Sequence, residues 1–84
     1  MELDVARIRS SFPALDLGVA HFDGPGGTQV PREVAEAVAG TLTSGISNRG
    51  TVTAAERRAD VVVADARAAV ADLLGGVPVG VVFA

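Results

Sequence analysis

The sequence predicts an α/β fold with the element order helix, strand, helix, long helix, strand. Two segments, near 31–44 and 54–74, carry apolar residues at the period of a helix with one buried face. Two short apolar runs, 19–22 and 81–83, are typical of strands. The second run is apolar on both faces, as in a strand that lies inside a sheet.

The first predicted helix covers residues 3–11. Asp4 is a suitable N-cap, and Val5 and Ile8 lie on one face of that helix. Phe12 precedes a proline and is therefore disfavoured in the α region, which ends the helix. The strand at 19–22 then ends in a dense turn signal of aspartate, glycine and proline.

The second predicted helix begins near Pro31, since proline suits the first helical position, and ends before Gly45. A polar loop follows, and Thr53 with Glu56 forms the capping-box pattern that opens the long helix. Gly75 and Gly76 end the long helix. Its predicted buried stripe consists of Val62, Ala66, Ala69, Val70 and Leu73.

Composition excludes several classes of function. The 84 residues carry a net charge of −3, and their seven basic residues are all arginines, scattered along the chain, which argues against a nucleic-acid partner. There is no cysteine and one histidine, so disulfides, thiolate metal sites and histidine-rich metal sites are not expected. No signal peptide or membrane-spanning run is predicted, which fits a cytoplasmic protein.

The chain is apolar for its size, with 49% hydrophobic residues and a mean hydropathy of +0.41. A small domain has a large surface for its volume and should need more polar residues. We therefore expect part of its apolar surface to be covered by more protein.

The glycine-rich turn at 23–31 has two interpretations. In the first, Gly26, Gly27 and Thr28 line a pocket for a carboxylate or phosphate, because glycines let backbone N–H groups approach a ligand and a helix N-terminus attracts anions. In the second, which composition alone favours, the segment is a tight structural turn. The dinucleotide-binding glycine spacing is absent.

The other polar candidates also have two interpretations each. Arg49, beside Asn48 in the loop between the last two helices, could bind a carboxylate or phosphate in bidentate fashion, or be a solvated loop arginine. His21 is more often packed than catalytic in such a position, and Asp23 is at least as often a turn former as an acid or base. Arg57, Arg58, Asp65 and Asp72 are most simply the solvent face of the long helix.

Several sequence features in series carry a family resemblance. They are Phe12-Pro13, the stretch from His21 to Pro31 (His-Phe-Asp-Gly-Pro-Gly-Gly-Thr-Gln-Val-Pro), Asn48-Arg49-Gly50, Ala66-Arg67 and Val81-Val82-Phe83. Their order and spacing resemble the N-terminal sequence of class V aminotransferases, and most closely that of cysteine desulfurases and desulfurase-like enzymes. The resemblance runs along nearly all of the chain. It departs from the usual desulfurase pattern at Gly24 and Pro25, where asparagine and alanine are more common.

The resemblance implies that residues 1–84 are the N-terminal segment of a fold-type-I pyridoxal-phosphate enzyme, a transferase that works as a homodimer. The cofactor's phosphate loop, its stacking histidine, its pyridine-pairing aspartate and the Schiff-base lysine would follow later in the parent protein. Gly26, Gly27 and Thr28 would face the substrate side of the pocket, and Asn48 and Arg49 would lie near the active site and the dimer interface. The substrate would be an amino acid, undergoing C–S cleavage or transamination.

The segment itself offers no catalytic residue and no metal ligand set. It contains no lysine to form a Schiff base, so the isolated chain is expected to be inactive. The alternative is a truncated, non-catalytic α/β module that acts by binding a partner. The isolated chain is also expected to self-associate, because the predicted strand 81–83 would be an open edge.

Overall fold

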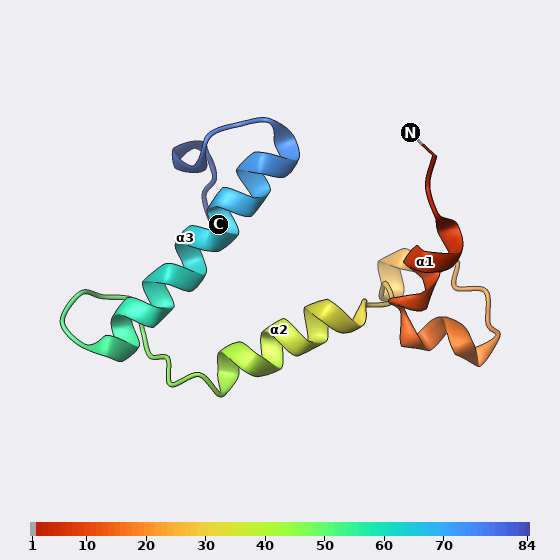
Figure 1. The fold of residues 1–84 in the computed structure, drawn as a ribbon, viewed down its shortest axis with the longest axis horizontal. Helices are drawn as coiled ribbons and strands as arrows, with labels where there is room; N and C mark the ends of the chain where they lie inside the picture. The colour runs from red at the N-terminus through yellow and green to blue at the C-terminus, as the bar shows by residue number, and fades with distance from the viewer. Residues whose placement is uncertain (1) are drawn as a thin grey trace. The chain divides into compact units, whose positions relative to one another are not determined.

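The computed structural model describes residues 2–84 and is built from helices (Figure 1). The regular helices are α1 (Val5–Ser10), α2 (Arg32–Leu42) and α3 (Ala54–Leu74). Three short 3-10 helices accompany them: η1 (Pro13–Leu17), η2 (Gly24–Gly26) and η3 (Pro78–Gly80). Within residues 2–84 there is no β-strand, so the predicted α/β fold is wrong.

Both predicted strands are irregular backbone in the structure. The run at 19–22 has no regular structure, and the side chain of Phe22 is 93% exposed. Val81 has extended dihedral angles (φ −95°, ψ 123°), yet residues 81–84 pair with no other described segment. An extended run becomes a strand only when a neighbour accepts its backbone hydrogen bonds. The apolar composition of these runs predicted that they would be buried, but no other described segment covers them.

The start of the chain folds much as predicted. The carboxylate of Asp4 caps α1 by accepting a hydrogen bond from the backbone N–H of Arg7 at 3.1 Å. Phe12 leaves the helical region (φ −110°, ψ 93°) before Pro13, which opens η1. The backbone N–H of Arg32 donates to the carbonyl oxygen of Ser11 at 2.8 Å. This bond fixes the start of α2 beside the end of α1.

The N-terminus of α3 confirms the predicted capping box. The hydroxyl of Thr53 accepts from the backbone N–H of Glu56 at 3.2 Å, and the carboxylate of Glu56 reaches back to the backbone N–H of Val52 at 3.4 Å. At the other end, Gly75 adopts the left-handed conformation (φ +69°), and the N–H of Gly76 donates to the carbonyl of Ala71 at 2.8 Å. The predicted glycine stop is therefore also confirmed.

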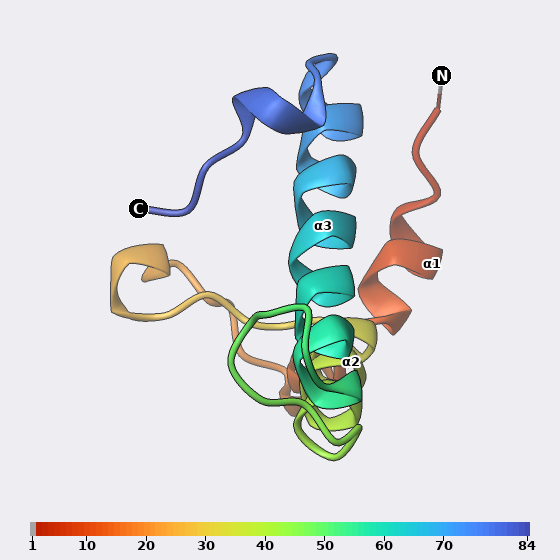
Figure 2. The same ribbon diagram turned by 90° about the vertical axis from the view of Figure 1, so that its left-hand side faces the viewer.

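The shielded face of α3 differs from the predicted one. Val62 and Val70 remain 41% exposed and Leu73 is 83% exposed. The least exposed positions instead follow a row at intervals of four residues: Ala55, Ala59, Val63, Arg67 and Ala71. The loop before α3 and the η3 turn lie against this helix (Figure 2), and no sheet covers the valine stripe within residues 2–84.

The chain divides into two compact units, the first ending at Thr41 and the second spanning Leu42–Ala84. Among the described residues, the buried hydrophobic side chains are those of Ala59 and Ala71 alone. The valines of α2 and the phenylalanine near the C-terminus stay largely exposed, with Val38 at 56% and Phe83 at 67%. That more protein covers these side chains stays a prediction from composition. No helix in the described part of the chain combines the length and the hydropathy that a bilayer crossing requires.

Candidate functional site

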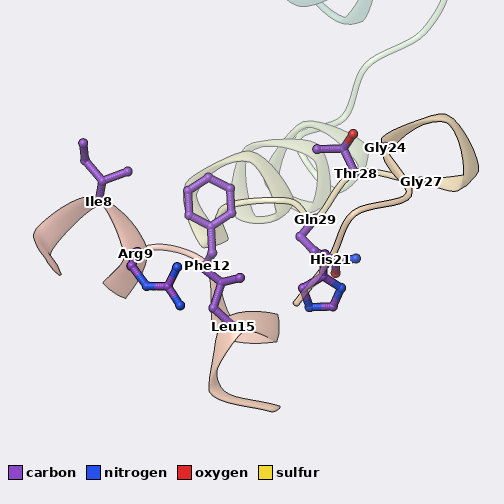
Figure 3. Close-up of a pocket in the computed structure, with 9 residues that line it drawn as sticks. All are labelled: Ile8, Arg9, Phe12, Leu15, His21, Gly24, Gly27, Thr28 and Gln29. Carbon is purple, nitrogen blue, oxygen red and sulfur yellow. The ribbon is translucent and has the colours of Figure 1, made fainter. Parts of the chain in front are cut away.

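The first unit contains an open pocket of about 260 Å³ (Figure 3). Its walls come from the end of α1, from the η1 turn and from the glycine-rich stretch that follows. The lining residues are Ile8, Arg9, Phe12, Leu15, His21, Gly24, Gly27, Thr28 and Gln29.

Two glycines shape the backbone that forms this pocket. Gly18 ends η1 in the left-handed conformation (φ +70°), and its N–H donates to the carbonyl of Leu15 at 3.4 Å. Gly27 ends η2 with φ +147°, a value that residues with a side chain rarely adopt. A Cβ atom at either glycine would meet no atom within 4 Å, so the requirement for glycine there comes from the backbone angle and not from space.

The pocket combines an apolar wall with polar groups of both donor and acceptor type. Ile8, Phe12 and Leu15 supply the apolar wall, and Figure 3 shows the guanidinium of Arg9 and the imidazole of His21 at the same opening. An arginine beside an apolar surface can hold the carboxylate of a ligand whose body packs on that surface. The arrangement suits a small organic anion.

The backbone amides of Gly26 and Gly27 are already used within the glycine-rich turn. The N–H of Gly26 donates to the carbonyl of Asp23 at 3.1 Å and to its carboxylate at 3.2 Å, and the N–H of Gly27 donates to the carbonyl of Gly24 at 3.1 Å. Both amides are therefore satisfied within the turn. The carboxylate of Asp23 also lies where a Cβ on Gly26 would be, so an alanine there would have to displace that side chain.

The sequence-predicted site residues fall into two groups. Gly27 and Thr28 line the pocket, and Gly26 lies in the turn beside them. Asn48 and Arg49 belong to the second unit. Arg49 forms an ion pair with Asp60 of α3, with 2.7 Å between Nε and Oδ1. The carboxylate beside Arg49 is therefore that of Asp60, and a role of Arg49 in ligand binding stays a prediction.

The loop before α3 is held by further arginines that the sequence interpretation had assigned to the solvent face. Nη1 of Arg58 donates to the carbonyl of Gly45 at 2.7 Å. Nη1 of Arg57 donates to the carbonyls of Thr51 and Val52, both at 3.2 Å. The sequence held a usable signal, because arginines in the first turn after a polar loop can reach back to its carbonyl oxygens.

Arg9 and Leu15 line the pocket, and sequence reasoning singled out neither of them. Arg9 reaches the pocket only because the chain turns at Phe12-Pro13 and returns through His21. His21 was expected to be packed, and its side chain is instead exposed at the pocket rim. That Arg9 and His21 line the same pocket follows from the path of the chain between residues 12 and 21, which sequence patterns do not reveal.

Residues 2–84 do not provide the groups that usually bind pyridoxal phosphate. A phosphate is usually held by several free N–H donors together, and the amides of Gly26 and Gly27 are satisfied next to the carboxylate of Asp23, which leaves Arg9 as the one arginine among residues 2–84 that lines the pocket. The 84 residues also contain no lysine for a Schiff base. Within residues 2–84 no group of His, Cys, Asp and Glu side chains could hold a metal ion. The pocket instead suits a small organic anion with an apolar part, held by Arg9.

Comparisons with known proteins give one curated relative and no assigned activity. The chain is 46% identical over 84 residues to a Mycobacterium tuberculosis protein named Uncharacterized protein MT3887. The match covers 99% of this chain and 21% of the relative, so the chain spans about a fifth of that protein's length. No protein-family model matches the sequence, and no solved structure matches it.

Proposed function

We propose that this chain is the N-terminal segment of a pyridoxal-phosphate enzyme that converts an amino acid, similar to class V aminotransferases and cysteine desulfurases. The reaction of the whole protein would be C–S cleavage or transamination, for which the cofactor supplies an electron sink. The cofactor would be held by residues outside this segment. A cytoplasmic homodimer is part of the same proposal.

The observation that supports this proposal best is the pocket of the first unit. Gly27 and Thr28, which the family resemblance assigns to the substrate side, share its lining with the guanidinium of Arg9 and an apolar wall. An amino-acid substrate has a carboxylate that Arg9 could hold and a side chain that the wall could contact. This segment would therefore position substrate, and groups elsewhere in the protein would do the chemistry.

The first test uses the natural protein that carries this segment, purified from its source. We expect an intact mass several times that of the 8.4 kDa chain, and a visible absorbance band that borohydride reduction removes, as for a lysine Schiff base. Amino acids such as L-cysteine and L-alanine should perturb that band. A natural protein that contains no pyridoxal phosphate would contradict the proposal.

A substitution at Arg9 tests the role of this segment. R9Q should raise KM for the amino-acid substrate by about tenfold, because a charge-assisted hydrogen bond to a carboxylate contributes about 1.5 kcal/mol or more. R32Q, an arginine of α2 outside the pocket, is the matched control and should leave KM unchanged. Equal KM values for R9Q and the unsubstituted enzyme would remove Arg9 from substrate binding.

A further inference from the structure

Arg67 lies in the middle of the shielded row of α3, with a polar atom that has no partner. Its Nε is inaccessible to solvent and finds no hydrogen-bond acceptor within residues 2–84. Ala71, the next position of the row, and Ala59, two positions before Arg67 along it, are the buried ones. An arginine is always protonated, and a buried donor without an acceptor is costly.

The helix itself offers no acceptor for this guanidinium. The positions three and four residues before and after Arg67 are Val63, Ala64, Val70 and Ala71, none of which is charged. Side chains at this spacing are the neighbours on a helix surface. An ion pair of the ordinary intrahelical kind is therefore excluded.

The aspartates of α3 also fail to serve Arg67. Asp60 is the partner of Arg49 at 2.7 Å. Asp65 lies two residues before Arg67 and Asp72 five residues after it, positions that face other sides of a helix with 3.6 residues per turn. The acceptor must come from outside α3.

A pocket of about 250 Å³ adjoins Arg67, between α3 and the η3 turn. Besides Arg67 it is lined by Ala64, Pro78 and Val79, so its other walls are apolar. Gly75 and Gly76 reverse the chain at the end of α3 and bring η3 back against the helix. In such apolar surroundings a carboxylate paired with a guanidinium is stabilised more strongly than it would be in water.

We propose that Arg67 is the receptor for a carboxylate side chain from another part of the same polypeptide, outside these 84 residues. The guanidinium would donate hydrogen bonds to this carboxylate in the pocket between α3 and η3. Val79 is 80% exposed, Val82 78% and Phe83 67%, so a protein segment that delivers the carboxylate would also cover apolar surface, which a free anion would not. The matched relative is about five times as long as this chain, so such a polypeptide has ample length to supply it. The inference does not depend on the cofactor.

The absence of lysine from these residues provides a site-specific test. In the whole natural protein, R67K places an amine at this site, and a zero-length carbodiimide reagent then joins that amine to any carboxylate in contact with it. Peptide mass spectrometry should find a crosslink from position 67 to an Asp or Glu outside residues 1–84 of the same molecule. R58K is the matched control, because Arg58 contacts the carbonyl of Gly45, and it should give no crosslink above background.

Other crosslinking results would overturn the proposal. A crosslink that joins isotopically labelled and unlabelled molecules would assign the carboxylate to a second copy. A crosslink confined to residues 1–84 would show that the carboxylate lies within this segment. No crosslink in a protein with unchanged helical circular dichroism would show that no carboxylate contacts position 67. Either result would overturn the proposal. A Tm that rises with inorganic phosphate in the unsubstituted protein but not in R67M would assign the site to a free anion.

A second measurement needs no substitution and covers the case in which R67K fails to fold. Phenylglyoxal modifies accessible guanidinium groups, and the rate at each arginine can be read by mass spectrometry. Phenylglyoxal condenses with the two Nη atoms, whereas the atom of Arg67 without a partner within residues 2–84 is Nε. In the whole protein, where a covering segment would shield the Nη atoms as well, Arg67 should react several-fold more slowly than the exposed Arg57. Equal rates at the two positions would show that nothing covers Arg67 and would overturn the proposal.

Discussion

The two irregular stretches on either side of α2 are both rich in glycine, but they are held in different ways. The stretch before α2 is organised from within: the carboxylate and carbonyl of Asp23 both accept from Gly26. The loop after α2 is organised by side chains of the following helix, through Arg57, Arg58 and the Arg49–Asp60 pair. The first stretch is therefore held by its own backbone and by Asp23, whereas the second is held by side chains at the N-terminal end of α3.

The largest effect should come from the helix cap that joins the second loop to α3. T53A removes the hydroxyl that accepts from the N–H of Glu56, and it should lower the local opening free energy of the first turn of α3 by about 1 kcal/mol. Hydrogen exchange of those amides in the native protein measures this. T51A keeps the carbonyl that Arg57 contacts and serves as the control. Equal exchange in T53A and T51A would show that the loop is not coupled to the helix.

A substitution at Gly50 should lower the opening free energy of the first turn of α3 by less than T53A does. A Cβ there would overlap the carboxylate of Glu56, so G50A must displace that side chain from the N–H of Val52 and the hydroxyl of Thr53. We expect the same amides to lose roughly 0.5–1 kcal/mol of protection, the net value of one hydrogen bond. Gly76 has no atom within 4 Å of its added Cβ and no positive φ, so G76A is the matched control. Unchanged exchange in G50A would mean that Glu56 can cap from another rotamer.

The Arg49–Asp60 pair should contribute less than the cap. Its side chains are 57% and 35% exposed, and exposed ion pairs of this kind contribute about 0.5 kcal/mol. A double-mutant cycle with R49Q and D60N should return that coupling energy, and it should shrink as salt is added. A coupling near zero at low salt would leave Arg57 and Arg58 as the side chains that hold the loop.

The sequence predicted helices and their ends well because those signals are local. The capping box at Thr53 and Glu56, the cap at Asp4 and the left-handed stop at Gly75 each depend on residues within about one turn. The strand predictions at 19–22 and 81–83 failed because strand formation depends on a pairing partner elsewhere, which residues 2–84 do not contain. The prediction that the isolated chain self-associates depended on an open strand edge at 81–83, which the described residues do not form.

The sequence predicted only part of the candidate site, because only part of it depends on neighbouring residues. The glycine and threonine at positions 27 and 28 were marked by the dense turn signal, and both line the pocket. Arg9 lies twelve residues before His21, on the other side of a proline turn, and periodicity alone does not bring them to one opening. Nε of Arg67 is shielded and lacks a hydrogen-bond acceptor within residues 2–84 because η3 packs beside α3. No short-range sequence pattern marks this arrangement.

A loss of amide protection no larger than the ion-pair coupling, and confined to the turn, should follow from a change in the self-contained stretch before α2. D23A removes the carboxylate from the N–H of Gly26, but that N–H keeps its bond to the carbonyl of residue 23 at 3.1 Å. We expect the Gly26 amide to lose about 0.5 kcal/mol of protection, the lower end for a hydrogen bond in an exposed turn, and the amides of α3 to be unchanged. D16A, at an exposed position in η1, is the control. If D23A also lowered protection in α3, the turn would be coupled to the helix, and the contrast between the two loops would fail.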